Sequence, residues 1–281
     1  MNNKTMGRYF PVFALPTVIA FTVGFIVPFA LGIYLSFCKF TTVTDAEWVG
    51  LSNYAKIFQD GDFLHALGFT VVFTIVSVIT INLFAFAIAL VLTRGIKGTN
   101  IFRTVFFMPN LIGGIILGYI WQLIINGVLS YFGRTITYSP AYGFWGLIIL
   151  MNWQSIGYMM IIYIAGLQNI PGELVEAAEI DGASKWQLLL KVKIPMMMSS
   201  ITICTFLTLT NSFKMFDQNL ALTAGAPSNK TQMIALNIYK TFYDKPGTEG
   251  IGQAKAVVFF ILVAAIALIQ LRATKSKEVQ Q

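Results

Sequence analysis

Charged side chains are scarce in this sequence: only 11% of its 281 residues are Asp, Glu, Lys or Arg, whereas 56% are hydrophobic. Soluble domains carry about 25% charged residues, so a chain of this composition could not cover its own surface in water. The high hydrophobic content also excludes an intrinsically disordered protein. The mean hydropathy of +0.72 agrees, and the composition therefore predicts a polytopic membrane protein.

Cysteine and histidine are almost absent, which limits the chemistry available to the chain. The two cysteines, Cys38 and Cys204, are too few for a secreted disulfide scaffold and have no companions at metal-ligand spacing. The one histidine, His65, is expected near a membrane interface. There is no His/Cys cluster and no nucleophile with an accompanying base. We therefore expect no metal, no cofactor and no enzymatic activity in this chain.

Positive charge exceeds negative charge, with a formal net charge of +7. Such an excess could indicate a nucleic-acid-binding protein, but membrane proteins concentrate Lys and Arg in their cytoplasmic loops. If the amino terminus is inside, the inner segments carry more of these residues than the outer ones, chiefly at residues 94–97 and 272–277. The distribution favours a membrane protein with both termini in the cytoplasm and without a nucleic-acid partner.

Uncharged stretches long enough to cross a bilayer recur along the chain. A helix needs about 20 apolar residues to cross a hydrocarbon core of roughly 30 Å. The predicted spans cover residues 13–37, 68–92, 105–125, 144–167, 196–213 and 254–271. The last is short, so Lys255 and Arg272 are expected to snorkel to the two interfaces. The first is too long for a signal sequence and is expected to be retained.

The loops between these spans are too short for a separate soluble domain. The two largest are a few dozen residues at most. We therefore expect an all-α polytopic membrane protein, with six transmembrane helices in a single domain over residues 1–281.

Residues 168–195 differ from an ordinary membrane loop because they concentrate charge in a charge-poor chain. Pro171 suits the first position of a helix, Asp181-Gly182 is a breaker pair, and Ser184 with Gln187 forms a capping box for a second short helix. The segment is expected to be a helix-turn-helix. Its apolar positions need a partner, and they are Leu174, Ala177, Ala178, Trp186 and Leu189. The alternative is an amphipathic loop that lies on the membrane surface.

The pattern Glu176-Ala-Ala-x-x-Asp-Gly-Ala183, with Pro195 further on, resembles the EAA loop of binding-protein-dependent ABC importer permeases. Further matches resemble the sugar-import branch of that family, and they are Gly50-Leu51-x-Asn53-Tyr54, Phe102-Arg103-Thr104 with Pro109, Gly157-Tyr158, Ala165-Gly166-Leu167-Gln168, Ile170-Pro171 and Phe216-Asp217 with Leu222-Thr223. One departure is Thr223-Ala-Gly-Ala-Pro227, where the family more often has additional glycines.

This resemblance implies a type I ABC importer permease fold whose EAA loop is a cytoplasmic coupling helix, seated in a cleft of an ATPase. The coupling residues would be Glu176, Ala177, Ala178, Asp181, Gly182, Ala183 and Pro195. ATP and Mg²⁺ would belong to that separate partner. The implied partners are a second homologous permease, two cytoplasmic ATPase subunits and an extracytoplasmic solute-binding protein, in the cytoplasmic membrane of a bacterium or archaeon.

Neutral polar residues at membrane depth are candidates for a transport path, and they are Asn110, Asn152, Gln154, Thr208, Asn211 and Ser212. Amides and hydroxyls suit a neutral polyhydroxylated ligand because they avoid the cost of burying a charge. Such residues also bond helices to one another, which is the alternative account.

Resemblance to the maltose-type subunit implies a carbohydrate ligand, an oligosaccharide, and places its sugar-lining positions at Asn110, Gly114, Trp153, Ile156, Gly157, Met160, Thr208, Asn211, Ser212 and Met215.

Two other classes of function compete with an importer permease. An ion-coupled secondary transporter or channel that works alone would use acidic residues inside its helices. No Asp or Glu lies in the six predicted spans, which argues against that class. A membrane-embedded enzyme would need a catalytic constellation, and the sequence contains none.

Overall fold

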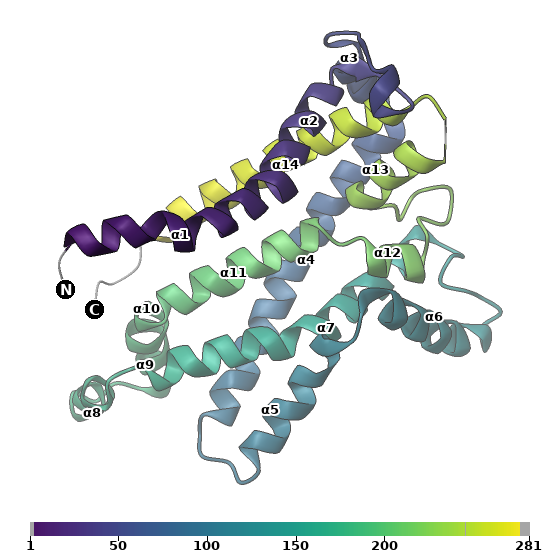
Figure 1. The fold of residues 1–281 in the computed structure, drawn as a ribbon. Coiled ribbons are helices and arrows are strands. Elements are labelled where there is room, and N and C mark those ends of the chain that lie inside the picture. The colour runs from purple at the N-terminus through teal and green to yellow at the C-terminus, as the bar shows by residue number, and fades with distance from the viewer. Residues whose placement is uncertain (1–2, 245, 276–281) are drawn as a thin grey trace. The chain divides into compact units, whose positions relative to one another are not determined.

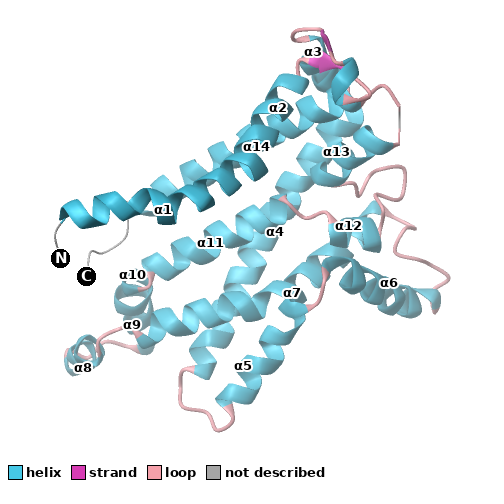
Figure 2. Ribbon diagram, in the orientation of Figure 1, coloured by secondary structure: helices cyan, strands magenta, loops and turns pink. Residues whose placement is uncertain are grey.

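The computed structural model describes residues 3–244 and 246–275. Helices make up nearly all of this part of the chain, as Figure 2 shows, and one short pair of strands accompanies them. The fold is therefore all-α, as the composition predicts. Residues 276–281, which include Lys277 of the predicted inner tail, lie outside the described residues. The cytoplasmic location of the termini stays a prediction.

Four helices among the described residues are long and apolar enough to cross a membrane. The first is the run Pro11–Leu35, which includes most of α1 (Asn3–Phe21) and continues through η1 (Thr22–Ile26) and α2 (Val27–Leu35). The others are α4 (Gly61–Leu92), α7 (Pro140–Gln168) and α14 (Glu249–Lys275). Two bent helix pairs bring the number of candidate spans to six. Several helices extend past the predicted spans because a helix can continue beyond the apolar stretch that crosses the hydrocarbon core.

The third predicted span is not one straight helix. It consists of α5 (Thr99–Phe107), the 3₁₀ turn η3 (Met108–Leu111) and α6 (Gly114–Ser130), and the axes bend by 102°. Pro109 lacks the N–H that a continuing helix would use. Ile112 and Gly113 are extended, with ψ of 130° and 140°. The predicted continuous helix over residues 105–125 is therefore replaced by two helices with a break at Ile112 and Gly113.

The fifth span follows the charged segment almost directly. The chain runs through α9 (Lys185–Leu188), the π-helical turn η4 (Leu189–Lys193), α10 (Ile194–Met196) and α11 (Met198–Phe213). Only Met197 interrupts the helical run, with ψ near 7°, and the axis bends there by 71°. The straight part, α11, agrees with the span predicted at residues 196–213.

The chain divides into two compact units. The first comprises the described residues up to Gly61 together with Ile238–Phe260. In it, β1 (Cys38–Lys39) pairs antiparallel with β2 (Glu47–Trp48), with Cys38 opposite Trp48. The rings of Phe29 and Phe260 pack edge to face at 5.0 Å, which ties α2 to α14. The prediction of one domain over the whole chain stays a prediction.

Lys255 on α14 does not snorkel to an interface as expected. Its side chain is 2% exposed, and its Nζ lies 2.7 Å from Asp60 Oδ2 and 2.8 Å from Thr241 Oγ1. Asp60 follows directly after α3 (Ser52–Gln59), and Thr241 lies on α13 (Ile234–Tyr243). The sequence could not show this partner, which is 195 residues away, and the nearby carboxylate makes burial of the ammonium group tolerable.

The second unit comprises Asp62–Asn237 and the described residues from Ile261 onward. Its core joins α4, α7 and α11, together with the short helix α12 (Asp217–Leu222) that packs on α6. The core side chains are almost fully buried and include Phe73, Ile81, Leu147, Leu150 and Met160. Within this unit, α8 (Gly172–Ile180) lies beyond the ends of α7 and α11, as Figure 1 shows.

Candidate functional site

The charged segment is a helix-turn-helix, as its sequence predicts. Helices α8 and α9 are separated by a turn, and Ser184 caps the second of them. The N–H of Gln187 donates to Ser184 Oγ at 3.3 Å, while the N–H of Ser184 donates to Gln187 Oε1 at 2.8 Å. Pro171 stands one position earlier than expected, because its extended ψ of 129° makes it the residue before the helix.

Gly182 closes α8 through its backbone conformation. Its φ of +77° lies in the left-handed region, which only glycine enters without strain. The N–H of Gly182 donates to the carbonyl of Glu179, and the N–H of Ala183 donates to that of Ala178, each at 3.0 Å. This pair of bonds is a Schellman motif. A β-carbon at position 182 would meet nothing within 4 Å, so there is open space beside the turn.

An apolar surface is exposed on this segment. The exposed fractions are 85% for Ile180, 73% for Trp186, 57% for Leu190 and 44% for Leu174. Large apolar groups exposed together outside a membrane span mark a surface that another molecule covers. The same segment carries four exposed acidic residues, which are Glu173, Glu176, Glu179 and Asp181. None of these four forms a salt bridge within the described part of the chain.

The structure brings six of the seven predicted coupling residues together on α8 and its following turn. Glu176, Ala177, Asp181 and Gly182 are exposed, while Ala178 and Ala183 are half-buried. Pro195 stands apart, in α10. The sequence analysis missed Ile180. Its position four residues after Glu176 and three after Ala177 puts all three on one helical face, and that spacing could have revealed it.

The ten predicted path residues divide into two groups by burial. Gly157, Met160, Thr208, Ser212 and Met215 are buried within the subunit. Trp153 and Asn211 are exposed, while Asn110, Gly114 and Ile156 are half-buried. The second group can be reached from outside this chain, so a path shared with another subunit would be lined by that group.

Two of the neutral polar candidates hold helices together. Asn152 Nδ2 on α7 donates to Thr80 Oγ1 on α4 at 2.9 Å. Tyr163 donates its hydroxyl to Asn82 Oδ1 at 2.7 Å, and Asn82 Nδ2 approaches Thr208 Oγ1 at 3.4 Å. This chain of polar contacts joins α7, α4 and α11. The sequence analysis missed Asn82, although it is the only amide side chain in residues 68–92.

A second polar cluster surrounds the break between η3 and α6. Gln154 Nε2 donates to the carbonyl of Ile112 at 3.4 Å, and Gln218 Nε2 donates to Gln154 Oε1 at 2.8 Å. Gly114 lies against α12, because a β-carbon there would be 2.7 Å from the β-carbon of Asp217. Asn110 and Gly114 flank this cluster in the chain. The sequence analysis missed Gln218, which lies outside the predicted spans.

Aromatic groups are available beside this cluster. The rings of Trp121 and Trp153 meet edge to face with centroids 5.7 Å apart, and Trp153 is 44% exposed. Groups of three or more His, Cys, Asp or Glu that could hold a metal are absent from the described ranges. The accessible chemistry of the site is therefore that of amides, hydroxyls and indole faces.

Residues 93–275 match the model of a family described as "Binding-protein-dependent transport system inner membrane component". The chain is 41% identical to the "Probable starch degradation products transport system permease protein AmyD" of Thermoanaerobacterium thermosulfurigenes, over 98% of this chain and 96% of that protein. It is 31% identical to the "Multiple sugar-binding transport system permease protein MsmF" of Streptococcus mutans, over 99% of each.

A solved structure also has this fold. It is the crystal structure of a bacterial ABC transporter involved in the import of the acidic polysaccharide alginate, one chain of which superposes with a TM-score of 0.79. The match covers 97% of this chain and 98% of that one, at 19% sequence identity. At that identity the likeness concerns the fold alone, and it agrees with the fold that the sequence predicts.

Proposed function

This chain belongs to the family of binding-protein-dependent transport system inner membrane components, and we propose that it is the permease subunit of an ATP-driven importer of oligosaccharides. Two relatives carry starch degradation products and multiple sugars in their names, which supports a carbohydrate. The chain would work with a second homologous permease, two cytoplasmic ATPase subunits and an extracytoplasmic solute-binding protein. ATP hydrolysis would take place on the ATPase subunits, with their Mg²⁺.

The exposed apolar face of α8 and α9 is the observation that carries this proposal. Ile180 and Trp186 are the most exposed large apolar residues of the segment. A cleft in a partner would cover them, and the acidic residues around them would determine which partner fits. The coupling role of Glu176, Ala177, Ala178, Asp181, Gly182, Ala183 and Pro195 is part of this proposal.

Transmission of motion follows from the short connection between α9 and α11, which is interrupted at Met197 alone. Because a single residue joins the two helical parts, movement of α9 would displace α11 through η4 and α10. The far end of α11 holds Asn211 and Ser212. Docking of a partner on α8 and α9 would thereby change the position of predicted path residues at the far end of α11.

The path itself suits a neutral ligand. The accessible residues Asn110 and Asn211 offer amide donors and acceptors, and the exposed face of Trp153 suits the C–H face of a sugar ring. No Asp or Glu lies in the predicted spans, so no fixed negative charge would need an ion to compensate it. This favours an importer powered by a separate ATPase over an ion-coupled transporter that works alone.

The proposal is tested with variants of the loop in the assembled transporter. Glu176→Lys reverses one exposed charge on α8, and Gly182→Asn keeps a residue that tolerates positive φ while adding a side chain to the open space. We expect both variants to lose sugar uptake and ATPase attachment while all six spans remain inserted. Glu47→Lys, an exposed acid in β2, is the matched control. Normal uptake by both loop variants would contradict the coupling role.

A further inference from the structure

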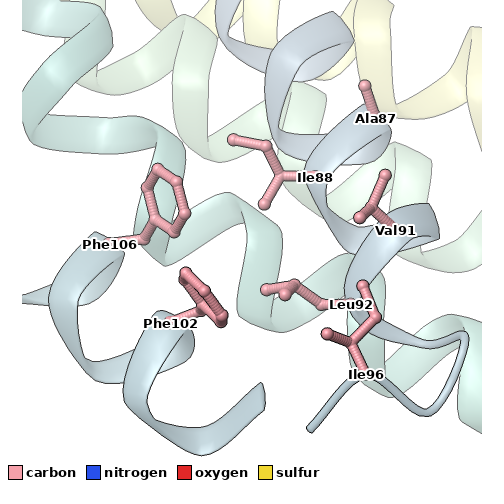
Figure 3. Close-up of a pocket in the computed structure, with 7 residues that line it drawn as sticks. All are labelled: Ala87, Ile88, Val91, Leu92, Ile96, Phe102 and Phe106. Carbon is pink, nitrogen blue, oxygen red and sulfur yellow. The ribbon is translucent and has the colours of Figure 1, made fainter. Parts of the chain in front are cut away.

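A wholly apolar cavity lies between α4 and α5 in the second unit. Its volume is about 400 Å³, within the range of about 300–1,000 Å³ that ligand sites occupy. As Figure 3 shows, Ile88, Val91 and Leu92 of α4 face Phe102 and Phe106 of α5 across it, and Ile96 from the connection lies at one end. None of its lining residues is polar, so the cavity offers no hydrogen bond to a sugar.

Three cationic residues are close in the sequence to residues that line this cavity. Arg94 and Lys97 belong to the exposed connection between α4 and α5, and Arg103 follows Phe102 directly on α5. The Nε of Arg103 is buried and has no hydrogen-bond partner in the described part of the chain. The sequence contains no Asp or Glu between Asp62 and Glu173, and none of these three cations forms a salt bridge among the residues that the structure describes.

An apolar cavity whose lining residues Ile96 and Phe102 are flanked in the sequence by cations matches an anionic phospholipid. We propose that this cavity holds an acyl chain of such a lipid and that Arg94, Lys97 and Arg103 bind its phosphate. Guanidinium groups bind phosphate through paired hydrogen bonds, which would provide a partner for the buried Nε of Arg103. On the orientation predicted from the Lys and Arg distribution, this end of α4 lies at the inner leaflet, where basic residues attract anionic headgroups.

A helix of a partner protein fits the cavity less well. The apolar lining is open to the outside and could be covered by a helix or by an acyl chain. A hydrophobic helix offers no anion for the three cations, whereas a phospholipid carries both an acyl chain and a phosphate.

Occupancy of the cavity would bear on the packing of the permease core. The side chain of Phe106 lines the cavity. The carbonyl oxygen of the same residue would be only 1.8 Å from a β-carbon added to Gly157. The same residue thus faces the lipid site and forms the crossing of α5 with α7. A bound lipid would support that crossing from the opposite side.

Lipid binding is measured by native mass spectrometry on the complex purified through a tag on this chain. After delipidation the complex is titrated with phosphatidylglycerol and, separately, with phosphatidylcholine of the same acyl chains. We expect phosphatidylglycerol to bind more tightly. Replacing Arg94, Lys97 and Arg103 by Gln should weaken it by about fivefold for each cation removed. The control replaces Lys39, Lys56 and Lys214 by Gln and should leave binding unchanged.

A second variant tests the acyl-chain half of the site. Ala87→Phe fills the cavity with a ring and should abolish the tightly bound lipid without altering any charge. If the triple variant is not stable, the Arg94→Gln, Lys97→Gln double variant carries the charge test, with about 25-fold weaker binding expected. Equal binding of the two lipids, or unchanged binding by the charge variants, would overturn the proposal. So would a photo-cross-linker at position 102 that captures a partner protein rather than a lipid.

Discussion

Gly157 of α7 lies directly against the backbone of Phe106 on α5. A β-carbon at position 157 would be 1.8 Å from the carbonyl oxygen of Phe106 and 2.3 Å from its carbonyl carbon. Both are main-chain atoms, so they cannot turn aside as the end of a side chain could. The two helices therefore cross with no side chain of residue 157 between them, just before the chain breaks at Ile112 and Gly113.

Gly157→Ala should separate these two helices. Overpacking of this kind costs about 1–3 kcal/mol or more, and here the obstacle is backbone. We expect a lower unfolding temperature of the detergent-solubilised protein and a smaller yield of assembled complex. Gly68→Ala on α4 is the matched control, because a β-carbon there meets nothing within 4 Å. Equal stability of the two variants would contradict the close crossing.

The two partners of the Lys255–Asp60 ion pair should differ in how much stability is lost when each is replaced. Asp60→Asn leaves the ammonium of Lys255 buried beside a neutral amide, whereas Lys255→Met leaves only a carboxylate that is 33% exposed and reached by water. Removing one partner of a buried ion pair costs about 3–5 kcal/mol. Because Asp60 is the more exposed partner, the loss in Lys255→Met should lie toward the lower end of this range. Thermal unfolding should show Asp60→Asn to be the less stable variant; the reverse order would argue against burial of Lys255.

The polar contacts between α4, α7 and α11 can be tested by a double-mutant cycle that measures the free energy of unfolding. Asn82→Leu removes the oxygen acceptor of the Tyr163 hydroxyl, and loss of such a partner by a buried hydroxyl costs about 1–3 kcal/mol. Adding Tyr163→Phe removes that hydroxyl as well, so the double variant should be more stable than Asn82→Leu alone. Strictly additive losses of unfolding free energy would show that the two residues act independently.

Much of this architecture could be predicted from the sequence because it depends on local signals. The six apolar stretches, the Ser184–Gln187 capping box and the turn at Gly182 each need only neighbouring residues. The break at Ile112 and Gly113 was not predicted, because an apolar window counts hydrophobic residues and gives little weight to Pro109. The burial of Lys255 depends on a partner distant in the sequence, which no local pattern reveals.

The candidate site was only partly predictable for the same reason. The sequence analysis identified residues of α8 through their pattern but did not use the spacing that puts Ile180 on the same helical face as Glu176 and Ala177. For the path, it identified polar residues at membrane depth but could not separate those that link helices from those that remain accessible. Asn152 is bonded to Thr80 within the subunit, whereas Asn211 is exposed.

Asn211 therefore gives the sharpest test of the path. Asn211→Leu removes an exposed amide for which the described part of the chain shows no side-chain hydrogen bond. Uptake should therefore become weaker, seen as a raised KM for sugar, while assembly is unchanged. Thr210→Val is the neighbouring control, because the Thr210 hydroxyl donates to the carbonyl of Phe206 in its own helix, at 2.9 Å. Unchanged uptake kinetics in Asn211→Leu would remove this residue from the path.

The most direct test of the account places a cysteine on the exposed face of α8. Both native cysteines are fully buried, so Ala177→Cys adds a single reactive thiol to which a photoactivatable cross-linker can be attached in native membranes. We expect a covalent adduct with a cytoplasmic ATPase, identified by peptide mass spectrometry. We also expect labelling of this thiol by an impermeant maleimide in inside-out vesicles. An adduct with lipid alone, or labelling of intact cells from outside, would contradict docking of α8 on a cytoplasmic ATPase.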